Sequence, residues 1–309
     1  MEFKLTTPVM FCIFRRMETT KRVFEKIREA KPTKLYIVAD AAREDVPGED
    51  KKVQTVRDYV ESHIDWPCEV KKNYAQTNMG CGMRMPSGIS WVLNQEEEAI
   101  ILEDDCVPDA SFFRYCQEML EHYRDNEKIM LISGNNPIAS AYDIKEAYGF
   151  TKIPFIWGWA TWARAWKKYD YELNEWPKQK NNPIWKDIFT KKAYWLYTAE
   201  FDELHKQKFD AWDYQLVYTV VMNDMLCVVP SDSHVLNIGF EEESTHTKDA
   251  PTWMKQDIKP VSLPIEYNDK IERDEGFDKT YMNLACNHGG IVHIKKMLGL
   301  NINKSIFER

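Results

Sequence analysis

Three consecutive carboxylates, Glu103–Asp105, directly follow the apolar residues Ile100–Leu102. With 49 acidic residues in 309, about one run of three acids is expected by chance, so the run by itself means little. Its position means more, because carboxylates at the end of a buried strand repel one another unless a cation or hydrogen-bond donors compensate them. Mg²⁺ and Mn²⁺ prefer such oxygen ligands and often share them with phosphates. This acidic triplet therefore predicts a metal–phosphate site, with an incidental acidic turn as the alternative.

Asp213 and His246 are two further residues whose side chains could take part in a reaction. Asp213 follows Trp212 at the start of an apolar helical segment. It could act as a general base, or it could be a first-turn acid favoured by the helix dipole. His246 lies in a polar stretch and could bind a metal or a phosphate, or be only solvated. The local sequence favours the structural interpretation for both residues.

Arginine and tryptophan offer contacts of two other kinds. Arg15, Arg16 and Arg84 lie at strand-end or loop positions from which a guanidinium could pair with a phosphate, although most surface arginines do not. Phe155–Trp166 holds four of the 11 tryptophans in the chain. A flat apolar ring with one N–H donor suits a sugar-binding surface and a packed core about equally, so both interpretations stay open.

The elements that must position these residues begin with a regular alternation of strands and helices. In the first 135 residues, short apolar runs indicate strands, and segments with apolar residues at helical spacing lie between them. This alternation predicts a parallel sheet covered by helices, with ligands beyond the carboxyl ends of the strands. Asp40 and the acidic triplet both lie at such ends. The expected strands are Pro8–Phe14, Lys34–Asp40, Glu69–Tyr74, Ala99–Leu102 and Lys128–Ser133.

The later part of the chain has a different pattern. Helical spacing predicts helices around Lys186–Phe189, over Ala193–Lys206 and over Trp212–Met222. Two short strands are expected at Leu226–Pro230 and His234–Ile238. Beyond about residue 250 the pattern weakens, which is typical of a peripheral segment. We therefore expect one domain over 1–250 and a C-terminal extension over 251–309, packed on that domain or peripheral to it.

The composition excludes several classes of protein. The formal net charge of −8 argues against a general nucleic-acid binder, which needs a dominant positive field. No stretch approaches the roughly 18 apolar residues that cross a bilayer, and Met1–Thr7 has no secretory-signal pattern. The 7 cysteines form no C-x-x-C pair, which is typical of reduced thiols. We therefore expect a cytoplasmic protein with no membrane span and no nucleic-acid partner.

Four ordered segments resemble the GT-A fold of nucleotide-sugar glycosyltransferases, in particular N-acetylglucosaminyltransferase I and its bacterial relatives. The segment that contains the acidic triplet is the most specific, because its residues follow the family's spacing. The resemblance implies a Rossmann-like α/β fold, with a mixed, mostly parallel sheet flanked by helices. It also implies a nucleotide-binding half over 1–135 and a sugar and acceptor half over 136–250. The four segments are Lys34–Asp40, Ile100–Phe113, Pro154–Trp166 and Trp212-Asp213.

The resemblance also implies roles for individual residues. Asp105 would bind the Mn²⁺ or Mg²⁺ ion that holds the donor diphosphate, with His246 as a further metal ligand. Asp213 would be the catalytic base of an inverting transferase, which reverses the local interpretation of this residue. Asp40 would contact the uracil ring. The residues implied in donor binding are Arg15, Asp40, Arg84, Glu103, Asp104, Gly158 and Trp159.

The implied reaction transfers a sugar, by default N-acetylglucosamine, from a UDP-sugar to a hydroxyl of a glycan or glycoconjugate. Displacement of a nucleotide diphosphate needs a cation at the leaving phosphate and a base at the attacking hydroxyl. A sugar-nucleotide pyrophosphorylase is one alternative, although Phe11–Arg16 lacks the glycines of the phosphate loop that such enzymes use. A carbohydrate-binding protein without turnover is the other, and the presence of both Asp105 and Asp213 argues against it.

Overall fold

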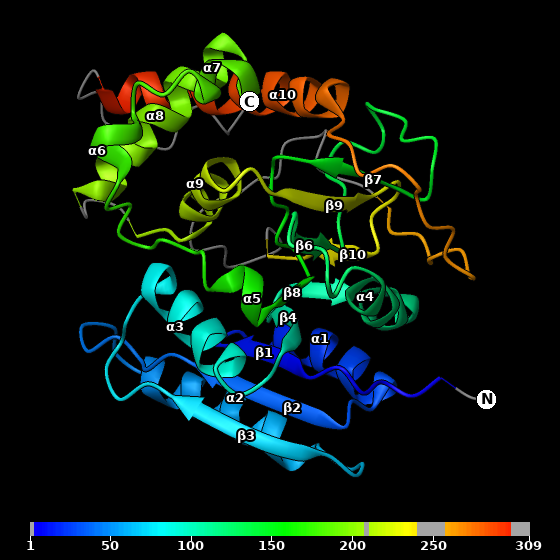
Figure 1. The fold of residues 1–309 in the computed structure, drawn as a ribbon. Helices are drawn as coiled ribbons and strands as arrows, with labels where there is room; N and C mark the ends of the chain where they lie inside the picture. Colours follow the sequence, from blue (N-terminus) through cyan, green and yellow to red (C-terminus); the bar gives the residue numbers. More distant parts are fainter. Residues whose placement is uncertain (1–2, 207–209, 240–256, 298–309) are drawn as a thin grey trace.

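Two β-sheets organise the molecule, and the larger one forms its centre (Figure 1). The computed structural model describes residues 3–206, 210–239 and 257–297. The larger sheet contains β1 (Val9–Ile13), β2 (Lys34–Ala39), β3 (Glu69–Tyr74), β4 (Glu98–Glu103), β6 (Ile129–Ser133), β7 (Tyr148–Thr151), β8 (Trp159–Trp162) and β9 (Leu226–Pro230). The smaller sheet pairs β5 (Cys106–Pro108) with β10 (Val235–Asn237).

The eight strands of the larger sheet follow the order β3-β2-β1-β4-β8-β6-β9-β7. β1 pairs in parallel with β2 and β4, β2 with β3, and β6 with β9. β8 lies antiparallel between β4 and β6, and β7 lies antiparallel to β9 at the edge. The predicted mixed, mostly parallel sheet is therefore confirmed, and the carboxyl ends of β1, β2 and β4 meet at one edge.

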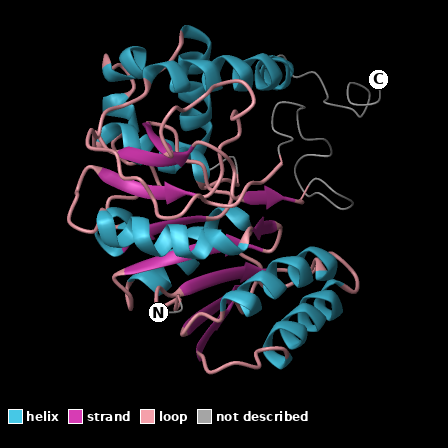
Figure 2. Cartoon of the chain, turned by 90° about the vertical axis from the view of Figure 1, so that its right-hand side faces the viewer, coloured by secondary structure: helices cyan, strands magenta, loops and turns pink. Residues whose placement is uncertain are grey.

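Helices cover both faces of this sheet, as the two perpendicular views show (Figures 1 and 2). Side chains alternate between the faces along a strand. Phe11 of β1 accordingly stacks on Phe24, with 6.4 Å between ring centroids, whereas Met10 faces Gly88. Within the described residues, no helix is long and apolar enough to span a membrane. The helices are α1 (Met17–Ala30), α2 (Glu49–Ser62), α3 (Cys81–Leu93), α4 (Ala110–His122), α5 (Ala163–Trp166), α6 (Trp176–Gln179), α7 (Ile184–Ile188), α8 (Lys191–His205), α9 (Asp213–Met222) and α10 (Glu275–Met297).

The first half agrees closely with the elements expected from the sequence. β1, β2, β3 and β6 lie within their predicted ranges, and β4 is one residue longer at each end. The tryptophan cluster behaves differently, because Trp159–Trp162 becomes the buried strand β8 in the middle of the sheet. No sequence pattern predicts β5, β7 or β8, since strands of three or four residues carry too little periodicity.

A second hydrophobic core, rich in aromatic side chains, lies between β9, α8, α9 and α10. It contains Trp176, Trp185 and Phe201 together with Phe277 from α10. α10 packs on α8 and β7, which Figure 1 shows at the end of the molecule farthest from β3. The segment from 257 to 286 thus supplies part of a core that the rest of the chain leaves incomplete.

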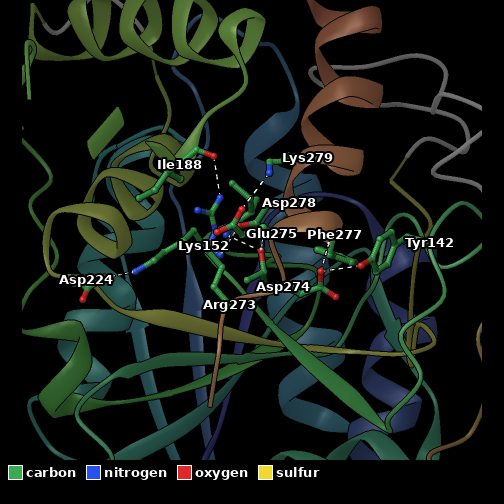
Figure 3. Close-up of polar contacts among 12 residues, drawn as sticks. Tyr142, Lys152, Ile188, Asp224, Arg273, Asp274, Glu275, Phe277, Asp278 and Lys279 are labelled. Carbon is green, nitrogen blue, oxygen red and sulfur yellow. Dashed lines mark hydrogen bonds and ion pairs between the residues drawn. The ribbon is translucent and has the colours of Figure 1, made fainter. Parts of the chain in front are cut away.

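A buried polar network fixes the start of α10 (Figure 3). The Asp278 carboxylate is fully buried and accepts hydrogen bonds from Arg273 Nε at 2.6 Å, from the Lys152 backbone N–H at 3.3 Å and from the Thr151 hydroxyl. Arg273 Nη2 in turn donates to the Ile188 carbonyl at 2.9 Å. Burial raises the pKa of the Asp278 carboxyl, and the hydrogen bonds from Thr151 and Arg273 act against that rise. This network joins α10 to β7 and α7.

Candidate active site

The acidic triplet lies where β4 leaves the sheet. Glu103 is the last residue of β4, and Asp104 and Asp105 form the turn into β5. Arg16, just before α1, joins the two aspartates, since its Nη2 lies 2.7 Å from Asp104 Oδ1 and 2.7 Å from Asp105 Oδ2. The Phe14 backbone N–H donates to Asp104 Oδ2 at 3.3 Å. Adjacent parallel strands thus bring the triplet and Arg16 to the same edge.

Negative charge exceeds positive charge at this edge. In the part of the chain that the structure describes, Arg16 is the only cation that forms an ion pair with the triplet. Burial raises the pKa of both Glu103 and Asp104. Although burial acts to lower it, the pKa of Arg16 is raised by Asp104 and Asp105. A further positive charge at this edge would relieve the repulsion between the carboxylates.

A hard divalent cation fits this set of donors, because all of them are carboxylate oxygens. Among the described residues, no group of three His, Cys, Asp or Glu side chains could hold a metal ion by itself. Ions such as Mg²⁺, however, often use one or two carboxylates together with phosphates of the substrate. Asp105, whose side chain is 16% exposed, can contribute to such a shared site.

The small sheet brings a distant segment to Asp105. The Ile238 backbone N–H donates to the Asp105 carbonyl at 2.9 Å, at the end of β10. Gly239 lies so close to the Asp105 carboxylate that a Cβ at this position would clash with it. The Gly239 N–H is held by Asn237 Oδ1 at 2.8 Å. Asn237 and Gly239 therefore belong to the site, although no sequence pattern singled them out, and His246 lies outside the described residues.

Asp40 follows β2 and holds the loop before α3. Its side chain is buried, and it accepts hydrogen bonds from the backbone N–H groups of Ala41, Met79 and Gly80 at 2.8, 2.9 and 3.0 Å. The side-chain amide of Asn78 donates to it at 3.1 Å. These four donors fix the carboxylate at the edge of the sheet. A nucleobase N–H would have to share the same two oxygens.

The two arginines implied in donor binding pair with other parts of the molecule. Arg15 Nε lies 3.4 Å from Glu49 Oε1 at the start of α2. Arg84 is buried in α3 and donates to Asn73 Oδ1 at 2.9 Å. Its Nε is buried and has no hydrogen-bonding partner among the described residues. Arg16, rather than Arg15 or Arg84, is the arginine that the structure brings to the triplet.

Gly158 directly precedes β8, and Trp159 is the first residue of this strand, which pairs with β4. Gly158 has a φ of +64°, and a Cβ there would come within 2.7 Å of Val235 Cγ2. Only glycine accommodates this conformation and this approach of β10. The Trp159 ring is fully buried, with its centroid 6.0 Å from that of Trp212. Trp159 therefore packs in the core of the protein, where its ring supports the segment that carries Asp213.

Tertiary contacts hold the segment before α9 against the sheet edge. Trp212 is buried, and its carbonyl accepts the Tyr169 hydroxyl at 2.9 Å. Two residues upstream, Asp210 Oδ1 accepts the Gly82 backbone N–H at the N-terminus of α3 at 2.8 Å. Asp213 follows as the first residue of α9 and is exposed. No local signal identifies Asp210, because its partner is 128 residues away in the sequence.

Asp213 lines a cavity, and its charge acts on the acidic triplet. Burial and the two neighbouring aspartates are the main causes of the raised pKa of Glu103, and the charge of Asp213 raises it further. Asp213 lines a cavity of about 300 Å³ together with Asn135, Trp157, Tyr214 and Tyr281. The structure therefore brings together the triplet, Arg16 and Asp213, which are far apart in the sequence. Such a site can hold a cation beside one carboxylate and deprotonate a hydroxyl with another.

Comparisons with known proteins give no relative at the level of sequence. No protein-family model matches the chain, and no curated protein matches it. No sequence-level match therefore links it to N-acetylglucosaminyltransferase I.

Solved structures give weak similarities. A mannosyltransferase from Pyrobaculum calidifontis in complex with GDP-Man and Mn²⁺ is 12% identical, over 52% of this chain and 45% of that one, with a TM-score of 0.34. A galactosyltransferase in complex with donor and acceptor sugar analogues is 8% identical, over 70% of each chain, with a TM-score of 0.35. A UDP-glucose pyrophosphorylase complexed with UDP-glucose is 10% identical, over 73% and 90%, with a TM-score of 0.37. Similarities at this level do not assign an activity.

Proposed function

We propose that this protein is a metal-dependent inverting glycosyltransferase. It would transfer a sugar, by default N-acetylglucosamine, from a UDP-sugar to a hydroxyl group of a glycan or glycoconjugate. The observation that supports this proposal most is the convergence of two acidic groups at one end of the sheet. The triplet carries more negative charge than Arg16 compensates, and Asp213 lies within electrostatic range of it, beside a cavity.

The triplet is the proposed site of the donor diphosphate. Asp105, with Mn²⁺ or Mg²⁺, would hold the two phosphates, and the bound ion would stabilise the charge that develops on the leaving group. Arg16 forms ion pairs with Asp104 and Asp105, and its guanidinium can also pair with phosphate oxygens. Asn237 and Gly239 fix the backbone beside Asp105. Excess negative charge here would thus become a binding site for an ion and an anion together.

Asp213 is the proposed general base. A carboxylate within hydrogen-bond reach of an acceptor hydroxyl takes its proton as the oxygen attacks the anomeric carbon. The bond from that carbon to the diphosphate oxygen breaks in the same step, and the proton ends on Asp213. Attack from the face opposite the leaving group inverts the configuration. Only one protein carboxylate is needed besides the metal site, unlike the two of a glycoside hydrolase.

The remaining residues implied in donor binding have indirect roles in this proposal. Asp40 and Arg84 fix the two ends of the loop before α3, where the base and ribose would lie. Gly158 allows β8 to approach β10, and Trp159 supports Trp212. Arg15 stabilises the start of α2 through Glu49. A contribution of His246 as a metal ligand is part of the same proposal.

Calorimetry with UDP, CDP and GDP, each with and without Mn²⁺, tests the proposal. We expect UDP to bind in the presence of Mn²⁺ and to bind much more weakly without it. UDP-sugars would then be screened for slow hydrolysis with the same ion dependence. Metal-independent binding of all three nucleotides would contradict the donor site. Formation of UTP and a sugar 1-phosphate from a UDP-sugar and pyrophosphate would indicate a pyrophosphorylase, and sugar binding without any turnover would indicate a binding protein.

A further inference from the structure

The cavity beside Asp213 is lined by segments that lie far apart in the second half of the chain, from Asn135 to Cys286. Its volume of about 300 Å³ lies at the lower end of ligand-site volumes, so it fits one small ring rather than an extended chain. Asn135 and Trp157 come from loops after β6 and before β8, and Asp213 and Tyr214 come from α9. α8 contributes Leu196 and Tyr197, and α10 supplies a further wall from Tyr281 to Cys286. The cavity therefore forms only when the C-terminal helix is in place.

Aromatic rings dominate these walls. Tyr281 of α10 packs edge-to-face on Phe155, with centroids 4.9 Å apart, and Tyr197 of α8 packs on Tyr214 at 5.7 Å. Such pairs hold the rings in fixed orientations, and their flat faces suit the C–H surface of a sugar ring. Burial raises the pKa of Tyr197, Tyr214 and Tyr281, so their hydroxyls stay protonated at neutral pH and can donate hydrogen bonds.

The charge of the side chains that line the cavity disfavours anionic ligands. Of the described residues that line the cavity, none is lysine, arginine or histidine, and Asp213 is the one acid. A phosphate or carboxylate group in this cavity would lie beside the Asp213 carboxylate, with no lysine, arginine or histidine among the described lining residues to pair with it, and like charges repel each other. Asn135, whose side-chain oxygen accepts the Trp157 backbone N–H at 3.2 Å, adds a polar but uncharged group. The cavity thus favours an uncharged ligand with several hydroxyls.

We propose that this cavity is the acceptor subsite, that it takes a single uncharged hexose ring, and that α10 forms its outer wall. The inference rests on the proposed function, because it gives Asp213 the acceptor hydroxyl to deprotonate. It adds the chemical class of the acceptor end and a role for the C-terminal helix. α10 is suited to this role, since Asp278 and Phe277 fix the helix about one turn before Tyr281.

Two substitutions on α10 separate the cavity from the rest of the helix. Ala285 lines the cavity, so Ala285→Phe would fill it without removing a contact of the core. Asn283 is exposed and is not among the lining residues, so Asn283→Phe adds the same ring outside the cavity. Tyr281→Ala would remove the aromatic wall instead, with Tyr267→Ala, at an exposed tyrosine elsewhere, as its control. Circular dichroism confirms that each variant is folded.

Saturation-transfer NMR on the full chain measures ligand contact directly. The probes are the methyl β-glycosides of glucose, galactose, mannose and N-acetylglucosamine, with glucose 6-phosphate as an anionic probe. We expect at least one neutral glycoside to give a signal that falls about tenfold in Ala285→Phe, because the ring occupies its place. The signal should fall in Tyr281→Ala and persist in Asn283→Phe and Tyr267→Ala. Glucose 6-phosphate should give none.

The inference is overturned if no neutral glycoside gives a signal, or if the signal is the same in Ala285→Phe and Asn283→Phe. It is also overturned if glucose 6-phosphate binds as well as the neutral glycosides. Binding of UDP with Mn²⁺ is measured on the same proteins and tests the donor site separately. Unchanged UDP binding with no glycoside signal rejects the acceptor subsite alone, whereas glycoside binding without UDP binding rejects the proposed donor site alone.

Discussion

The acidic triplet and the Asp278 network both take carboxylates out of water, but they compensate them differently. At Asp278, one fully buried carboxylate accepts three hydrogen bonds, one of them from Arg273. At the sheet edge, three carboxylates lie together, and Arg16, which pairs with Asp104 and Asp105, is the one ion-pair partner of the triplet in the described part of the chain. The Asp278 carboxylate, with its hydrogen bonds satisfied, stabilises the fold, and under the proposed function the incompletely compensated triplet binds a ligand that brings positive charge. The following substitutions test this distinction.

Asp213→Asn, at the proposed active site, is expected to give the largest effect, which is a loss of turnover. The amide keeps the size of the side chain but cannot take a proton, so kcat should fall by about 10²–10⁴-fold while the affinity for UDP stays the same. Steady-state kinetics and calorimetry measure the two quantities. Unchanged turnover would show that Asp213 only begins α9. Retention of configuration in the product, read by NMR, would also contradict a single displacement.

Asp278→Asn tests whether the Asp278 network stabilises the fold. Loss of the charge leaves Arg273, whose side chain is 16% exposed, without its anion. Removal of one partner of a fully buried pair costs about 3–5 kcal/mol of the free energy of unfolding, and we expect the lower end of that range here. Urea denaturation followed by circular dichroism measures it. Glu275→Gln is the matched control, because Glu275 pairs with Lys279 on the exposed face of the same helix and should have no measurable effect. Equal stability of the two variants would show that Asp278 does not anchor α10.

Unlike Asp278→Asn, the substitution Asp105→Asn should weaken ligand binding and leave stability unchanged. Stability should be retained, because the substitution reduces repulsion within the triplet. The Mn²⁺-dependent affinity for UDP should fall about tenfold or more, equivalent to about 1.4 kcal/mol. Calorimetry measures the affinity, and Asp50→Asn, at an exposed position in α2, serves as the control. Full Mn²⁺-dependent binding by Asp105→Asn would remove this residue from the proposed metal site.

His234 is a buried titratable group that is a base rather than an acid. Its contribution to the pH dependence of stability is the smallest of the effects that we expect. Burial lowers the pKa of His234, which precedes β10 and whose Nδ1 lies 2.7 Å from the Lys259 carbonyl. The folded protein therefore binds this proton less readily than the unfolded chain. Stability should fall as the pH drops below about 6.5, by about 1.4 kcal/mol for each unit by which the pKa is lowered.

Urea denaturation at pH values between 5 and 8, compared with His234→Gln, isolates this contribution. The amide of glutamine can still donate to the Lys259 carbonyl but does not titrate, so the variant should show a weaker pH dependence over this range. Identical pH profiles for the two proteins would show that His234 binds its proton equally well in the folded and unfolded states.

The residues at the strand ends were accessible to prediction because the relevant signals are local. Apolar runs before Asp40 and before the triplet indicate buried strands, and parallel strands place their carboxyl ends together. The partners of these acids were not accessible. The sequence does not distinguish Arg15 from Arg16, yet a shift of one residue turns the side chain from Glu49 to the triplet. That choice depends on where β1 ends and α1 begins.

The sequence alone thus specifies the strand-and-helix alternation of the first half and the acids at its edge, since these follow from spacings of a few residues. The tertiary structure determines which residues lie next to those acids. Asn237 and Gly239 reach Asp105 only through the pairing of β5 with β10, and the aromatic cavity exists only because α10 returns to α8 and β7. Contacts between segments far apart in the chain leave no period in the sequence. They form because each segment has an apolar face that the other must cover.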